Sequence, residues 1–185
     1  MNEGRILHRD ISENNVIITD AGGAGDPRGM LIDLDLAKNL DDVPSGTRYR
    51  TGTMQFMAIG VLENELHTYR HDLESIFYVF LWTIILYPKR TNPKLPTPRR
   101  LQRWYEGSYQ DIADVKRGHM ADNRLFNEFP PRFAELKGLA KELRQALFPM
   151  RDGSIFTGTY VDSSMVYNPM IQSFEKAIAN IGGEL

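Results

Sequence analysis

The sequence predicts a mainly α-helical protein of the α+β class, with a short β-hairpin that precedes a set of helices. Residues 16–19 and 30–32 are short apolar runs rich in β-branched side chains, which is typical of strands. Between them, the glycine- and proline-rich residues 20–29 suit the tip of a hairpin. Beyond residue 64, apolar residues recur at helical spacing, so the larger part of the chain is expected to be helical.

The longest predicted helix covers residues 72–88. Asp72 is a candidate N-cap, a carboxylate follows in the first turn, and Pro88 is expected to end the helix. Its uncharged stretch, residues 75–87, is shorter than the roughly 20 residues that a bilayer requires. Because the segment is apolar on all sides, we expect the buried central helix of a helical domain.

Further helices follow along the chain. Two weaker helical segments cover residues 101–105 and 112–120, and an amphipathic helix is expected within residues 131–147. The pair Asn168–Pro169 is expected to open a last helix.

Composition excludes several functional classes. The 185 residues suit one domain, and a net charge of −2 gives no field that would draw the chain onto nucleic acid or an anionic membrane. The absence of cysteine excludes disulfides, thiolate zinc sites and cysteine nucleophiles, which fits a reducing compartment. The first ten residues alternate charged and apolar side chains, unlike a signal peptide. We therefore expect a soluble intracellular protein, cytoplasmic or nuclear, without a nucleic-acid or membrane partner.

A polar motif near the start of the chain indicates chemistry. His8, Arg9 and Asp10 stand in a row, and Asn15 follows Asp10 by five residues. A His-Arg-Asp triplet alone is weak evidence for a functional site. With the asparagine at this offset, the pattern is unexpected by chance. A carboxylate such as Asp10 can accept the proton of a hydroxyl nucleophile.

A second carboxylate completes a candidate site. Asp33 ends the second predicted strand within LIDLDLAK, and a carboxylate that leaves a buried strand needs a partner. Asp33 and Asn15 bracket the hairpin, so both can direct oxygens into one site of the kind that Mg²⁺ prefers. A base with two metal-holding oxygen donors is what phosphoryl transfer requires.

The chain resembles the C-terminal lobe of a protein kinase, in particular the fungal-type protein kinase family. The resemblance rests on LHRDISENNVI, LIDLDLA, GTMQFMA and YRHDLESIFYVFLW, which span residues 6–82 in family order. It implies ATP-dependent phosphorylation of protein serine or threonine, with ATP and Mg²⁺ as cofactors. It also implies one kinase-like domain over residues 1–185, divided into a catalytic loop (8–15), an activation segment (33–63) and a helical subdomain (64–185).

The resemblance assigns roles by position. Asp10 falls on the catalytic base, Asn15 on the second metal ligand and Asp33 on the first. His8 and Arg9 complete the catalytic-loop motif, and Arg9 is placed to pair with a phosphate on the activation segment.

Three more positions take roles from the same resemblance. Thr53 matches the threonine beside the base, and Ser12 lies on the substrate-facing side of the catalytic loop. Asp72 matches the aspartate that supports the catalytic loop through hydrogen bonds to its backbone. A carboxylate at a buried helix N-terminus is suited to anchoring a strained loop.

The sequence departs from the common kinase pattern at several positions. Ser12 replaces a lysine, and Leu34 and Asp35 replace the Phe-Gly that follows the metal aspartate. Gly60 stands where the A-P-E motif has its glutamate, which predicts a less rigidly braced lobe. The glycine-rich loop and the V-A-I-K lysine of an N-terminal ATP-binding lobe are absent from the 185 residues, so negligible activity is expected of this chain alone.

Three functions stay open. The first is a truncated kinase lobe whose partners are a protein substrate or the missing N-terminal lobe. The second is a non-catalytic, pseudokinase-type binding or scaffold module, and the third is a small-molecule phosphotransferase. The joint presence of Asp10, Asn15 and Asp33 favours the first, since a scaffold needs none of them.

Overall fold

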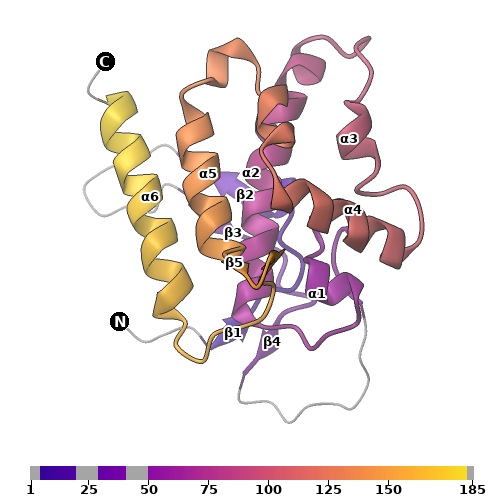
Figure 1. Cartoon of the computed structure of the whole chain (residues 1–185), viewed down its shortest axis with the longest axis vertical. Coiled ribbons are helices and arrows are strands. Elements are labelled where there is room, and N and C mark those ends of the chain that lie inside the picture. Colours follow the sequence, from indigo (N-terminus) through magenta and orange to yellow (C-terminus); the bar gives the residue numbers. More distant parts are fainter. Residues whose placement is uncertain (1–4, 20–28, 41–49, 183–185) are drawn as a thin grey trace.

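The computed structural model describes residues 5–19, 29–40 and 50–182 of the chain. The described part is mainly helical with a few short strands, as the sequence predicts. The long helix α2 (Tyr69–Thr91) lies in the middle, with α5 (Leu136–Leu147) and α6 (Ser164–Gly182) on one side and α4 (Tyr109–Ala121) on the other (Figure 1). The strands of the N-terminal part, drawn in indigo and purple, lie behind and below the central helix in this view.

The predicted hairpin is confirmed. Strands β2 (Val16–Ile18) and β3 (Gly29–Leu31) pair antiparallel, with Val16 opposite Leu31. Its predicted glycine-rich tip falls on residues 20–28, outside the described residues. Two further antiparallel pairs were not predicted, because strands of two residues leave no periodic pattern: β1 (Ile6–Leu7) with β4 (Lys38–Asn39), and β5 (Met150–Arg151) with β6 (Ser154–Ile155).

Helix α2 is longer than predicted at both ends. It begins at Tyr69, because Thr68 and His71 form a capping box in which the Thr68 N–H donates to His71 Nδ1 at 3.0 Å. Asp72 is therefore not the N-cap and its carboxylate is available for other partners. Pro88 does not end the helix, which continues for three residues with the Asn92 N–H bonded to the Pro88 carbonyl at 2.9 Å. Proline lacks the N–H that would bond to the preceding turn, yet the three residues after Pro88 remain helical.

The hydrophobic core surrounds α2. Tyr78 and Trp104 are fully buried, and their ring centroids lie 4.9 Å apart. Burying an aromatic or large aliphatic side chain of this kind contributes about 1.5–3 kcal/mol. Other fully buried core side chains come from α2, α4, α5 and the segments between them: Phe56, Phe77, Leu81, Leu101, Ile112, Phe126 and Leu143.

The other helices are short or shifted relative to the prediction. Helix α5 begins only at Leu136, because the prolines upstream form a separate 3₁₀ turn, η4 (Pro131–Phe133). Helix α6 begins at Ser164 and contains Pro169 in its second turn. The remaining elements are α1 (Ile59–Leu62), α3 (Arg99–Gln102), η1 (Glu13–Asn15), η2 (Met54–Phe56) and η3 (Arg124–Glu128).

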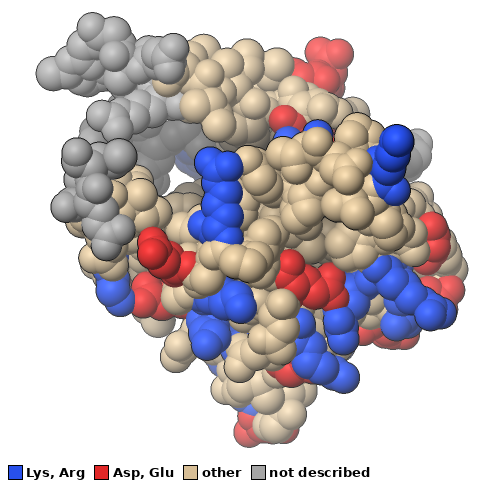
Figure 2. Space-filling view, turned by 90° about the horizontal axis from the view of Figure 1, so that it is seen from above, with Lys and Arg blue, Asp and Glu red and all other residues tan. Residues whose placement is uncertain are grey.

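The surface carries both signs of charge. Seen from above, Lys and Arg side chains lie in several groups beside Asp and Glu side chains (Figure 2). Among the described residues, no helix is both long enough and apolar enough to cross a membrane.

Candidate active site

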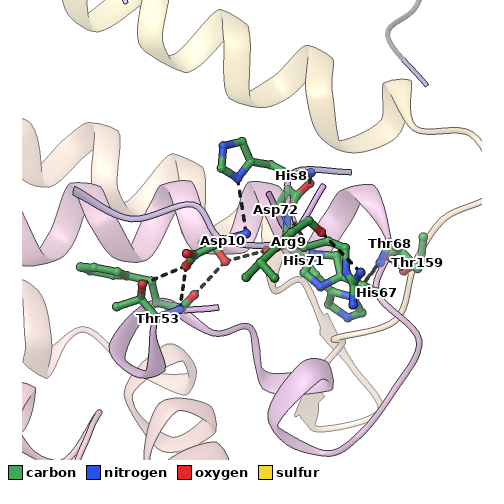
Figure 3. Close-up of polar contacts among 12 residues, drawn as sticks. His8, Arg9, Asp10, Thr53, His67, Thr68, His71, Asp72 and Thr159 are labelled. Carbon is green, nitrogen blue, oxygen red and sulfur yellow. Dashed lines mark hydrogen bonds and ion pairs between the residues drawn. The ribbon is translucent and has the colours of Figure 1, made fainter. Parts of the chain in front are cut away.

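The Asp10 carboxylate is held by Thr53. Oδ1 of Asp10 accepts two hydrogen bonds of 2.8 Å, one from the Thr53 backbone N–H and one from its hydroxyl (Figure 3). These residues are 43 positions apart, so the bonds join the loop after β1 to the segment before η2. With Oδ1 occupied, the second oxygen of the carboxylate is oriented for another partner.

Asn15 lies on the other side of the same loop. Its side-chain Nδ2 donates to the Asp10 carbonyl at 2.9 Å and lies 3.5 Å from Asp10 Oδ2. The asparagine is buried and sits at the end of η1, whose short turn brings it back toward Asp10. Because Nδ2 faces Asp10, the amide oxygen faces away from it.

Asp72 anchors the backbone of the loop. Its Oδ2 accepts from the His8 N–H at 2.7 Å, and its Oδ1 accepts from the Arg9 N–H at 3.0 Å (Figure 3). His67 Nε2 lies 2.8 Å from the same Oδ1. Arg9 has a positive φ of 68°, a conformation that costs a non-glycine residue of order 1–3 kcal/mol. The two backbone bonds to a buried carboxylate therefore hold a strained turn immediately before Asp10.

The His8 ring connects this loop to the chain that leads into Asp33. His8 Nδ1 faces the Asp10 N–H at 3.4 Å, and Nε2 lies 3.0 Å from the Ile32 carbonyl. The tautomer with the proton on Nε2 suits both contacts. The Ile32 N–H in turn donates to the Asn15 carbonyl at 3.0 Å. Asp33, the next residue, is exposed and has a φ of 63°.

Asn15 and Asp33 fit a hard divalent cation as a partial ligand set. One offers an amide oxygen and the other a carboxylate, which are ligands that Mg²⁺ prefers when phosphate and water complete its shell. The bond between Ile32 and Asn15 keeps the two residues next to each other. Within the described ranges, no group of three or more His, Cys, Asp or Glu side chains could hold a metal unaided.

Gly52 is a site residue that sequence reasoning did not single out. It has a φ of 111°, and a Cβ atom there would lie 2.8 Å from the Arg9 carbonyl oxygen. Only glycine allows the segment before Thr53 to approach the loop this closely. The sequence could have indicated this role, because Gly52 directly precedes the predicted site residue Thr53.

The segment after Thr53 is braced by a buried carboxylate. Glu74 in α2 accepts from the Ile59 N–H at 2.7 Å and the Tyr78 hydroxyl at 2.6 Å, both on Oε1. Its Oε2 pairs with Arg70 Nη1 at 2.6 Å, and Arg70 Nη2 reaches the Leu147 carbonyl at 2.7 Å. Burial raises the pKa of Glu74. The Arg70 guanidinium, together with the hydrogen bonds from Tyr78 and Ile59, outweighs this effect, so the pKa lies below its usual value.

Glu74 changes the interpretation of Gly60. The sequence predicts weaker bracing because a glutamate is missing at position 60. The structure supplies a glutamate from α2 instead, bonded to the backbone of the preceding residue, Ile59. A side chain at position 60 has no room, because its Cβ would lie 2.5 Å from His71 Nε2.

The two remaining predicted site residues, Arg9 and Ser12, lie on either side of Asp10 in the sequence. Ser12 is buried at the N-terminal side of η1. The Arg9 guanidinium reaches the Leu36 carbonyl at 3.4 Å, at the beginning of the predicted activation segment. Residues 41–49 of that segment lie outside the described residues.

The first part of the chain is similar to known proteins. The chain is 35% identical over 75 residues to inhibitor of nuclear factor kappa-B kinase subunit alpha from Gallus gallus. The model of the fungal protein kinase family matches residues 1–84. This matched part of the chain includes every residue that the sequence predicts for the site. The alignment with the Gallus gallus protein covers 40% of this chain but only 10% of that relative.

Proposed function

We propose that this chain provides the catalytic-loop half of a protein kinase active site, for transfer of the γ-phosphoryl group of ATP to a protein serine or threonine. The observation that carries the proposal is the Asp10 carboxylate, which is oriented by Thr53 and flanked by Asn15. In this proposal residues 1–185 form one kinase-like domain of helical-lobe type.

Asp10 acts as the base in this proposal. Thr53 occupies Oδ1 with two hydrogen bonds, so Oδ2 is the oxygen that accepts the hydrogen of the substrate hydroxyl. A positioned carboxylate contributes mainly by orienting the nucleophile, and general-base help of this kind amounts to roughly 10²–10⁴-fold in rate. Asp72, through His8 and Arg9, keeps the loop in the strained conformation that presents Asp10.

Asn15 and Asp33 would hold Mg²⁺ with the phosphates of ATP. The bound ion would neutralise charge on the transferring phosphoryl group. The chain's own contribution is the fixed spacing between these two residues, set by the bond from Ile32 to Asn15 and by the His8 ring on the Ile32 carbonyl. Positioning of this type supplies most of the catalysis in phosphoryl transfer.

The 185 residues alone are proposed to be inactive. Their sequence contains neither a glycine-rich nucleotide loop nor the strand lysine that positions ATP phosphates. Activity then needs these parts from outside this sequence, and its partners are that ATP-binding lobe and an intracellular protein substrate. The small share of the Gallus gallus kinase that the chain covers is in keeping with this view.

The metal role of Asp33 gives the test. Mg²⁺-dependent transfer from labelled ATP to a generic protein substrate is measured for the native polypeptide that carries this sequence. Asp33→Asn should reduce transfer at least a hundredfold, whereas the matched control Asp35→Asn, two residues away and also exposed, should stay within threefold. Equal activity of the two variants would contradict the proposal. A wild-type polypeptide without transfer or ATP binding would favour the binding-module alternative.

A further inference from the structure

Lys116 in α4 is a lysine within the protein core. Its side chain is 0% exposed, whereas lysine is almost never fully buried unless it is paired. The ammonium Nζ donates to the Met57 carbonyl at 2.6 Å and to the Gln55 carbonyl at 3.0 Å. Both acceptors are backbone atoms, one within η2 and one in the residue that follows it, 61 and 59 residues away along the chain.

Two aromatic rings complete the surroundings of the ammonium. Nζ lies 4.3 Å from the centroid of Tyr78 and 5.3 Å from that of Trp104. Ring faces at this range attract a cation by about 0.5–2 kcal/mol. Burial lowers the pKa of Lys116 to about 7, and the nearby Glu74 carboxylate acts in the opposite direction. The rings and the carbonyls also favour the charged form.

Lys116 belongs to a set of side chains that hold one short backbone segment. Three successive carbonyls, those of Gln55, Phe56 and Met57, accept from buried side chains of two helices. Lys116 binds the first and the third, and Ser75 Oγ donates to the Phe56 carbonyl at 2.7 Å. Glu74 accepts from the Ile59 N–H just beyond them. The position of the segment is therefore set largely by side chains rather than by a strand or a long helix.

The same segment begins with the residue that holds the base. Thr53 directly precedes η2 and gives Asp10 both of its 2.8 Å bonds. A displacement of residues 55–57 would thus move Thr53 relative to Asp10. We infer that Lys116 is a positioning residue: through the Gln55 and Met57 carbonyls it fixes the segment that keeps Thr53 on Asp10. Its importance for catalysis rests on the proposed function, but the geometric coupling does not.

Hydrogen exchange of the Thr53 amide tests the coupling without a catalytic assay. This amide donates to Asp10 and reports the bond directly. In the 185-residue chain, Lys116→Met keeps the side-chain volume and removes the donors. The Thr53 amide should then exchange at least tenfold faster, while the amides of Phe77 and Leu81 in α2 stay within threefold of wild type.

A conservative variant separates positioning from packing. Lys116→Arg keeps a cation and donors, and it should bring Thr53 exchange to within threefold of wild type. A packing role predicts the opposite order, since methionine fits the volume better than arginine. Arg117→Met is the matched control on the same helix, because Arg117 pairs with Glu63 at 2.7 Å near the surface. It should leave Thr53 unaffected.

Two results would overturn the inference. One is a Thr53 amide in Lys116→Met that exchanges at the wild-type rate or only in step with Phe77 and Leu81. The other, which decides the matter if Lys116→Met does not fold, is a folded Lys116→Arg chain in which Thr53 exchange is accelerated more than tenfold. If the protein shows no activity in a kinase assay, that result bears on the proposed function alone, because the exchange experiment involves no phosphoryl transfer.

Discussion

Arg70 and Glu74 form an ion pair that is wholly enclosed by the protein, with Arg70 Nη1 2.6 Å from Glu74 Oε2. Each partner makes a second bond to backbone: Arg70 to the Leu147 carbonyl and Glu74 to the Ile59 N–H. The pair therefore links the segment after Thr53 to the end of α5. Because both charges are buried, each depends on the other for compensation.

Removing one partner of this pair should be severely destabilising. Glu74→Gln leaves the Arg70 charge buried without a counter-ion, and a loss of about 3–5 kcal/mol in the free energy of unfolding is expected. The double variant Arg70→Met/Glu74→Gln should lose less than the sum of the losses in Arg70→Met and Glu74→Gln. Urea unfolding measures all three. Glu63→Gln, in a partly exposed pair with Arg117, should cost at most about 1 kcal/mol, and additive losses at 70 and 74 would refute the coupling.

Introducing a side chain at Gly60 should destabilise the protein. The Cβ of Gly60→Ala would lie 2.5 Å from the buried His71 Nε2, and His71 is fixed by the Thr68 N–H on its other nitrogen. Overpacking of this kind costs about 1–3 kcal/mol. Gly118→Ala is the control, since nothing lies within 4 Å of a Cβ at this position in α4, and it should stabilise by about 0.5–1 kcal/mol. A Gly60→Ala chain as stable as wild type in thermal unfolding would show that this packing is not tight.

Gly52 should tolerate no side chain either, for a different reason. Gly52→Ala combines a φ of 111° with a Cβ 2.8 Å from the Arg9 carbonyl, so it should cost about 1–3 kcal/mol and separate Thr53 from Asp10. Gly153→Ala has the backbone strain of φ 80° without a close atom. Chemical-shift changes at Asp10 and Thr53 in the first variant, but not in the second, are the expected result. Unchanged shifts in Gly52→Ala would argue against the close approach.

Lys116 should make stability depend on pH. Burial lowers its pKa to about 7 in the folded protein, below the usual value of 10.5. Below pH 7 the lysine is charged in both states and contributes no pH dependence. Above pH 7 the unfolded chain binds one proton more than the folded chain, so stability should rise with pH by up to about 1.4 kcal/mol per unit.

The comparison with Lys116→Met isolates this effect. The difference in unfolding free energy between wild type and Lys116→Met, measured from pH 6 to 9.5, should shift in favour of wild type above pH 7. Groups that titrate alike in both chains cancel in the difference. A difference that stays constant over this range would mean that the carbonyls and rings keep the lysine charged.

The sequence predicts the hairpin and the helices because their apolar residues follow regular spacing. The pairing of β2 with β3 is one example, and the apolar helix α2 is another. In both, the local sequence pattern determines the type of element. The ends of α2 were missed because the capping by Thr68 and His71 outweighs a weaker cap candidate at Asp72. Asp10, Asn15 and Asp33 could be singled out together because they lie within one short stretch of the sequence, on the two sides of the predicted hairpin.

The supports of the site could not be predicted in the same way. Lys116 lies in a polar-looking stretch, YQDIADVKRGHMA, and its acceptors are more than fifty residues away. Glu74 reads as a carboxylate in the first turn of a helix, although it serves as the brace for Ile59. Such roles depend on which elements come together in space, and no local pattern records them.

The base role of Asp10 is the central claim, and one substitution tests it most directly. Phosphoryl transfer from Mg²⁺-ATP to protein is measured under single turnover for the native polypeptide that carries this sequence, with Asp10→Asn beside the Asp35→Asn control. Asp10→Asn keeps the shape and an oxygen that Thr53 can bond. It should lower the transfer rate by roughly 10²–10⁴-fold with ATP affinity unchanged. A transfer rate for Asp10→Asn within threefold of the control would contradict the account.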